Sequence, residues 1–152
     1  MVTTDETPFE IGKAQLLYGG ESATGSERAD VGIIATGALV YKALKVAEQL
    51  KKENISAKVL NISTVKPIDT EAVIAIAQTC GAIVTVEEHQ IIGGLGSAVS
   101  EVLSQNFPVP QEFIGVRNLF GQSGTQAELL EHYEMGESHI LASAKKVIGR
   151  KG

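Results

Sequence analysis

Apolar and polar residues alternate along this chain in blocks that predict strands and helices in turn. Five short, nearly continuous apolar blocks have the length and composition of buried strands, and they cover residues 14–18, 31–36, 57–62, 82–86 and 112–116. Between and after these blocks, apolar residues recur every three or four positions, which is the spacing of a helix with one buried face. We expect such helices to begin at Gly37, at Asp69 or Thr70, after the glycines near residue 93, at Thr125 and near Ser138.

The order of these elements predicts an α/β fold: a three-layer α/β/α sandwich around a sheet of about five mostly parallel strands. A parallel pair of strands needs a crossover, usually a helix, to return the chain, and strands with continuous apolar runs are covered on both faces. The polar, glycine-rich segment 19–30 joins the first strand to the second without a helix. We therefore expect the first strand to run antiparallel at one edge of the sheet. We assign residues 1–13 to an N-terminal tail and residues 14–150 to one domain.

Composition and charge exclude several classes of protein. The hydrophobic fraction of 43% and the charged fraction of 20% are typical of a globular protein. A net charge of −5, with scattered lysines and arginines, offers no basic face to nucleic acid. We expect no signal peptide, because the start MVTTDETPFE has neither a basic nor an apolar region. No apolar run in the sequence approaches the roughly 20 residues needed to cross a membrane. The single cysteine, Cys80, excludes an internal disulfide and a multi-cysteine metal site, and we expect a reduced, cytoplasmic protein with no nucleic-acid or membrane partner.

The segment from Ala82 to Leu103 carries the most information about function. An apolar strand stops at a charged tip, and a glycine-rich turn then opens a helix: Glu87, Glu88 and His89 form the tip, and Gly93, Gly94 and Gly96 the turn. Open parallel sheets place ligand or partner contacts at such points, at the carboxyl ends of their strands. Strand geometry sends Glu87 and His89 to one side of the strand and Glu88 to the other.

Several kinds of site are open for this segment. The turn could cradle a phosphate, because free N–H groups and the helix dipole attract anions, although it matches neither the dinucleotide nor the P-loop fingerprint. His89 could transfer a proton, whereas two carboxylates and one imidazole without a third ligand type make a weak metal signal. In the structural alternative, Gly93 and Gly94 allow a sharp turn and Gly96 lets helix and sheet approach closely. The tip then makes polar contacts across an interface or with the turn itself.

Two further segments contain residue types that could carry chemistry. Lys66 could bind a phosphate or a carboxylate, but Pro67 and Asp69 also fit a rigid strand-to-helix link in which Asp69 caps the helix. Ser123 with His132 or His139 is not a catalytic triad, because no residue at hand orients the base. We expect both histidines to lie on the surface of helices or near their ends.

Four segments, in this order, closely resemble the C-terminal domain of transketolase. They are IATGALVYKALKVAEQL at 34–50, VLNISTVKPID at 59–69, IVTVEEHQIIGGLGSAVSEVL at 83–103 and IGVRNLFGQSGTQAELLEHY at 114–133. The wider group includes deoxyxylulose-phosphate synthases and the beta subunits of 2-oxo acid dehydrogenases. The Glu-Glu-His tip and the FGQSG segment at 120–124 favour the transketolase branch. One departure is Asn118, which stands where the family often has an acidic residue.

The resemblance implies a part of a transferase that moves two-carbon ketol units between sugar phosphates, in the pentose phosphate pathway of carbohydrate metabolism. The complete enzyme of this family is a dimer with three α/β domains, and it holds thiamine diphosphate and a divalent metal such as Mg²⁺ between the first two. The Gly-Asp-Gly…Asn signature that binds the diphosphate is missing from this sequence. We therefore expect the chain to bind no cofactor or metal alone and to be inactive in isolation.

The resemblance further implies that the chain is a cut-out C-terminal domain or the end of a split, two-chain enzyme. Its partners would be the N-terminal and pyrimidine-binding domains or subunit of the same enzyme, in a homo-oligomer. No catalytic residue is carried over from the family. The residues that we expect closest to substrate or cofactor are Glu88, His89, Gly93 and Gly94. Two other functions stay open: a partner-binding module of a 2-oxo acid dehydrogenase beta-type subunit, and a free-standing anion binder.

Overall fold

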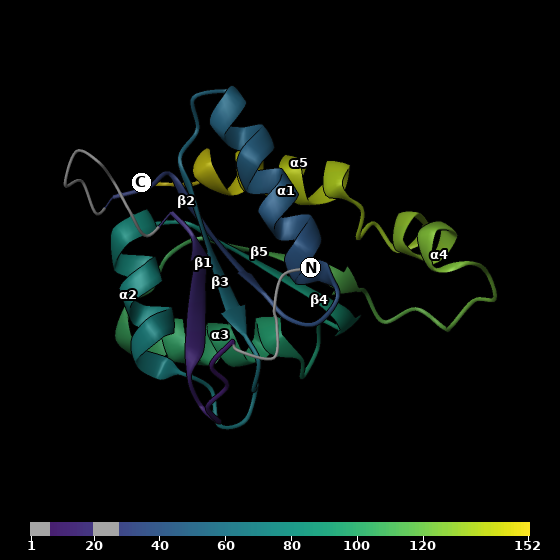
Figure 1. Ribbon diagram of the computed structural model, residues 1–152, viewed down its shortest axis with the longest axis horizontal. Helices are drawn as coiled ribbons and strands as arrows, with labels where there is room; N and C mark the ends of the chain where they lie inside the picture. The colour runs from purple at the N-terminus through teal and green to yellow at the C-terminus, as the bar shows by residue number, and fades with distance from the viewer. Residues whose placement is uncertain (1–6, 20–27) are drawn as a thin grey trace.

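Figure 1 shows the fold as a computed structural model, which describes residues 7–19 and 28–152. Every expected strand and helix is present in it. Along the chain they are β1 Ala14–Tyr18, β2 Val31–Ala35, α1 Leu39–Lys52, β3 Ala57–Ile62, α2 Thr70–Cys80, β4 Ile83–Gln90, α3 Leu95–Asn106, β5 Gln111–Val116, α4 Gln126–His132 and α5 Glu137–Ile148. Parts of the expected tail 1–13 and of the expected loop 19–30 lie outside the described residues, and the domain limits 14–150 stay a prediction.

Within the described residues, five strands form one sheet in the order β1-β3-β2-β4-β5. Strand β1 runs antiparallel to β3, and all the other pairs are parallel. This confirms the expected mostly parallel sheet with one antiparallel edge strand. The four parallel strands all end at one end of the sheet, which we call the carboxyl end. Because β1 is antiparallel and its Ala14 pairs with Ile62, β1 starts at that same end.

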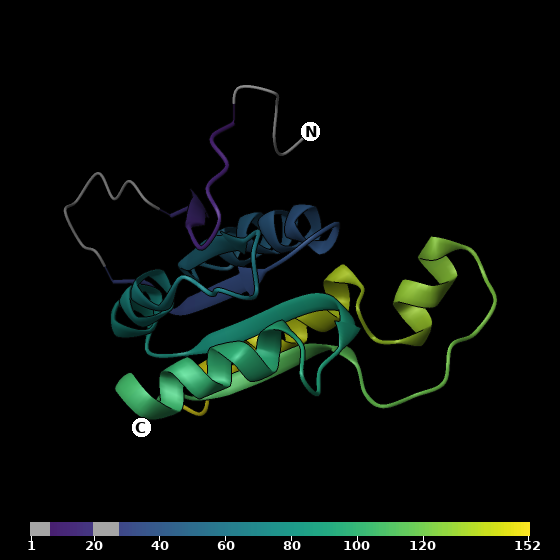
Figure 2. The same cartoon turned by 90° about the horizontal axis from the view of Figure 1, so that it is seen from below.

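The helices complete a three-layer sandwich, as expected. Helices α1 and α5 pack on one face of the sheet, and α2 and α3 on the other (Figure 1). Each face has its own cluster of buried apolar side chains. Helix α4 covers neither face: both views show it beyond the sheet (Figure 2). Its buried Leu130 belongs to the apolar cluster on the face covered by α1 and α5.

The link between β3 and α2 fixes the start of β1 at the carboxyl end. One oxygen of Asp69 accepts the N–H of Ala72 at 3.1 Å, which confirms the expected cap of α2. Its other oxygen accepts the N–H of Ala14 at 2.9 Å. The hydroxyl of Thr64 accepts the N–H of Gly12 at 2.8 Å. The same link therefore caps a helix and anchors the antiparallel strand.

At the opposite, amino end of the sheet, Glu112 joins β5 to the end of α5. Its largely buried carboxylate accepts from Lys146 at 2.9 Å and from Arg150 at 2.6 Å. Arg150 also donates to the carbonyl of Gln111 at 2.9 Å. Burial alone would raise the pKa of Glu112, but hydrogen bonds from Lys146 and Arg150 and their charges outweigh it. The pKa therefore lies below the ordinary value of 4.5.

The ion pairs of Glu112 with Lys146 and Arg150 make the stability of the chain depend on pH. The pKa of Glu112 is lower in the folded chain than in the unfolded chain, so the ionised carboxylate stabilises the fold at pH values above the unfolded pKa of about 4.5. This stabilisation is lost as the pH falls from that value through the lower pKa of the folded chain. Glu112→Gln should lower the free energy of unfolding by about 1–2 kcal/mol at pH 7. The difference from the unsubstituted chain should shrink below pH 4 or so.

Urea unfolding at a series of pH values measures this effect. Glu48→Gln, on the exposed side of α1, is the matched control and should change the free energy of unfolding by less than about 0.5 kcal/mol at every pH. An equal loss of stability in Glu112→Gln at neutral and acidic pH would contradict the role assigned to its charge.

Candidate functional site

Strand β4 is longer than the sequence indicates, and the charged tip belongs to it. The expected strand ended at Val86, but β4 continues to Gln90, which pairs with Val116 of β5 after a shift of register. The N–H of Ile91 then donates to the carbonyl of Val116 at 3.0 Å. The strand continues through the polar residues because Glu87, the first of them, is buried and hydrogen-bonded to the start of α3.

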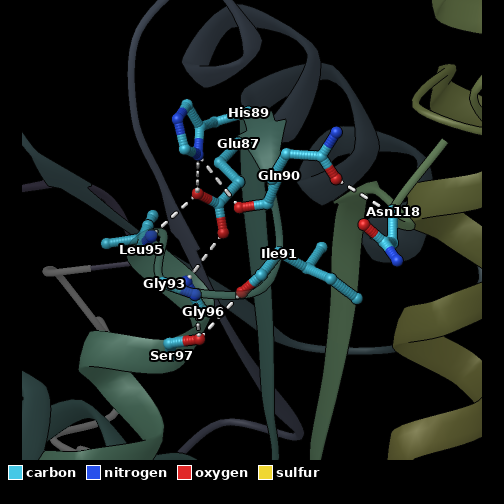
Figure 3. A network of polar contacts seen from close by, with 9 residues as sticks. All are labelled: Glu87, His89, Gln90, Ile91, Gly93, Leu95, Gly96, Ser97 and Asn118. Carbon is cyan, nitrogen blue, oxygen red and sulfur yellow. Dashed lines mark hydrogen bonds and ion pairs between the residues drawn. The ribbon is translucent and has the colours of Figure 1, made fainter. Parts of the chain in front are cut away.

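Glu87 is only 2% exposed, and its carboxylate caps helix α3 from the neighbouring strand. One oxygen accepts the N–H of Leu95 at 2.7 Å and the other accepts the N–H of Gly96 at 2.8 Å (Figure 3). The N-cap position itself is Gly94, which has no side chain to do this. Two charge-assisted hydrogen bonds and the positive end of the helix dipole compensate for the burial of the carboxylate.

The glycines of the turn have the structural roles that their spacing indicated. Gly93 has a φ of +78°, a left-handed conformation that few other residues adopt. A Cβ atom on Gly94 would collide with the carboxylate of Glu87. A Cβ atom on Gly96 would lie 2.5 Å from the ring of Phe113 on β5. The turn therefore requires Gly93 for its conformation, whereas Gly94 and Gly96 allow helix, turn and sheet to approach closely.

Three backbone donors of the turn and the helix start are already used inside the chain. Besides the two N–H groups bound to Glu87, the N–H of Gly93 donates to the hydroxyl of Ser97 at 2.9 Å. That hydroxyl in turn donates to the carbonyl of Ile91 at 2.8 Å (Figure 3). A phosphate would have to displace a buried carboxylate from the start of α3. The geometry thus argues against a phosphate cradle and favours the expected contact between the tip and the turn.

The four residues expected closest to substrate or cofactor lie near Glu87. His89 is exposed on the same side of β4, with Nδ1 4.0 Å from a Glu87 oxygen and 3.0 Å from the carbonyl of Gln90. Gly93 is exposed in the turn and Gly94 is buried next to it, whereas Glu88 is exposed on the strand. Their place beside substrate or cofactor stays a prediction.

Gln90 ties the loop after β5 to this site. Its side-chain oxygen accepts the N–H of Asn118 at 2.9 Å (Figure 3). Its side-chain nitrogen donates to the carbonyl of Leu119 at 3.3 Å. Asn118 has a φ of +54°, which Asn tolerates better than most residues. Further along the loop, the hydroxyl of Tyr133 donates to the carbonyl of Phe120 at 2.8 Å. The end of β4 and the loop after β5, distant in sequence, are thus held side by side.

Sequence reasoning missed Gln90, and although it placed Glu87 in the charged tip, it did not identify Glu87 as the cap of α3. One available signal was the lack of a capping side chain at the start of α3, while an unpaired carboxylate preceded it by eight residues. Lys66 is exposed in the link before α2, and His132 and His139 lie on α4 and α5, as expected.

The described part of the chain does not fit the metal of thiamine diphosphate. Across residues 7–19 and 28–152, no group of three or more His, Cys, Asp or Glu side chains could hold a metal ion. The start of α3, the place where a diphosphate could meet free N–H groups, is taken by Glu87. Among the residues that the structure describes, no helix has the length and apolar character needed to cross a membrane.

The cap of α3 can be tested with two adjacent glutamates. Glu87→Gln keeps the shape but turns one acceptor into an NH₂ group that faces a helix N–H, so the free energy of unfolding should fall by about 2–3 kcal/mol. Glu88→Gln changes an exposed residue and should shift the free energy of unfolding by less than about 0.5 kcal/mol. Urea denaturation of both variants measures the difference, and equal effects would refute a structural role for Glu87.

Comparison with known proteins agrees with the sequence resemblance. A family model described as "Transketolase, C-terminal domain" matches residues 20–140. The chain is 43% identical over 150 residues to the 6-deoxy-6-sulfo-D-fructose transketolase subunit SqwH of Clostridium sp. (strain MSTE9), covering 99% of this chain and 44% of that protein. It is 36% identical over 151 residues to the 1-deoxy-D-xylulose-5-phosphate synthase of Syntrophus aciditrophicus (strain SB), covering 97% of this chain and 22% of that one.

A solved structure extends the agreement to three dimensions. It is described as "Split gene transketolase, inactive beta4 tetramer", is 39% identical and superposes with a TM-score of 0.90, covering 100% of this chain and 47% of that chain. The chain therefore spans less than half the length of these relatives. The matched residues include the β4–α3 turn and the loop after β5, the two segments joined at the site. The chain belongs to the transketolase C-terminal domain family.

Proposed function

We propose that the chain is the C-terminal domain or subunit of a transketolase-type transferase that moves two-carbon ketol units between sugar phosphates. In this proposal it acts in assembly and in the contact between copies of the enzyme, not in the chemical step. The observation that carries the proposal is the use of Glu87 and of the N–H groups of the turn to build α3. The carboxylate of Glu87 and the N–H groups of Leu95 and Gly96, which were candidates for acid chemistry and anion binding, therefore stabilise the fold.

The proposal includes inactivity of the isolated chain. The solved relative described as "Split gene transketolase, inactive beta4 tetramer" is a precedent for an inactive assembly. Its chain is about twice as long as the part that this chain matches. Thiamine diphosphate and its metal would be bound by the N-terminal and pyrimidine-binding sections of the complete enzyme.

The names of the relatives given above refer to a sulfo-sugar and to a deoxyxylulose phosphate, so we do not propose a place in the pentose phosphate pathway. The cytoplasmic location stays a prediction.

Reconstitution tests this proposal. The chain alone, supplied with thiamine diphosphate, Mg²⁺, a ketose phosphate and an aldose phosphate, should show no product above background. Addition of the enzyme section encoded before it, in the same reading frame or in the neighbouring gene, should give ketol transfer that saturates at a one-to-one ratio. Chromatography of the sugar phosphates measures the product.

Two results would overturn the proposal. Ketol transfer by the chain alone would place catalytic groups within it. Retention of the chain on an immobilised peripheral-subunit-binding domain, with no transfer after reconstitution, would assign it to a 2-oxo acid dehydrogenase instead.

A further inference from the structure

Exposed apolar side chains gather at the carboxyl end of the sheet. Nine large hydrophobic side chains are exposed among the residues that the structure describes, and six of them lie in the loops at this end: Phe9, Ile11, Val65, Ile92, Leu119 and Phe120. Single exposed apolar residues are ordinary, but a group of them at one end of a domain marks an interaction surface. The amino end instead has a polar hollow lined by residues such as Arg28, Asp30 and Lys151.

The two most exposed members, Phe120 and Ile92, lie in the loop that Gln90 holds and in the turn that follows Gln90, and Leu119 lies next to Phe120. Phe120 is 96% exposed, Ile92 is 72% exposed and Leu119 is 52% exposed. These three residues form what we call the docking surface. Ile92 lies in the turn after β4, and the other two lie in the loop after β5. Aromatic residues dominate the energetics of protein interfaces, so Phe120 is the natural anchor.

The backbone of the docking surface is fixed although its side chains are exposed. The carbonyl of Leu119 accepts from Gln90, and the carbonyl of Phe120 accepts from the hydroxyl of Tyr133. A loop that is already held in place loses little conformational entropy when a partner covers it. The docking surface is therefore prepared for a partner.

The path of the chain identifies the partner. Residues before β1 reach the sheet at the carboxyl end, where Gly12 is bound to Thr64 and Ala14 to Asp69. In any enzyme that carries this domain at its C-terminus, the preceding section is joined at this end, at the β1 edge of the sheet, and would extend across the end to reach the docking surface beside β4 and β5. We propose that the docking surface binds the section of a transketolase-type enzyme that precedes this domain, with Phe120 as the main anchor. This inference rests on the proposed function.

Binding of the preceding section to substituted chains tests the proposal. The probe is the enzyme section encoded before this chain, titrated by calorimetry. Phe120→Ala should weaken binding by at least about 30-fold, the loss typical of an interface hot spot, and Ile92→Ala should weaken it by about tenfold. Phe107→Ala is the matched control, because Phe107 is an exposed phenylalanine at the end of α3, away from the docking surface.

The control should bind within about twofold of the unsubstituted chain, since it lies outside the docking surface. Phe120 and Ile92 are largely exposed, so thermal unfolding of their variants should be unchanged and a loss of binding would not reflect misfolding. Hydrogen exchange at residues 91–94 and 117–121 should slow in the complex.

Three results would overturn the inference. If the unsubstituted chain forms no complex, the proposed function fails and the docking surface with it. If the complex forms but Phe120→Ala and Phe107→Ala bind equally well, the docking surface is wrong while the proposed function stands. If Phe120→Ala abolishes self-association of the chain and leaves the complex unchanged, the surface binds a second copy instead.

Discussion

Two backbone N–H groups at the start of α3 point at the carboxylate of Glu87, and the arrangement of the carboxyl end follows from this contact. Because the contact keeps β4 extended beyond Val86, the strand carries Gln90 to a position opposite Val116. Gln90 then holds the loop after β5. A buried charge at a helix start is thus linked, through one strand, to the presentation of Phe120 on the surface.

The two buried glutamates of the sheet show how one residue type is accommodated in two ways. Glu87 is stabilised by backbone N–H groups and a helix dipole, whereas Glu112 is stabilised by Lys146 and Arg150. The first contact shapes the carboxyl end, where the loops are apolar and exposed. The second fixes α5 on β5 at the amino end. In both cases the carboxylate joins a strand to a helix that follows it in the chain.

Much of the fold could be predicted from the sequence because its signals are local. Apolar blocks marked each strand, the lack of a helix after Tyr18 indicated the antiparallel β1, and Asp69 had the spacing of a cap. The end of β4 could not be predicted, because polar residues normally end a buried strand and the partners of Glu87 come from the next helix. The contact from Gln90 to Asn118 joins residues 28 positions apart, which no local pattern records.

The limits of the family match have a consequence for anyone who isolates this domain. The match begins at residue 20 and ends at residue 140, so it leaves out β1 and most of α5. A fragment cut at those limits would lack β1 and would expose the edge of β3 that β1 covers. The unpaired backbone groups of that edge would pair with strands of other molecules. The same cut would also remove both cations that neutralise Glu112. Such a fragment would aggregate through its exposed strand edge.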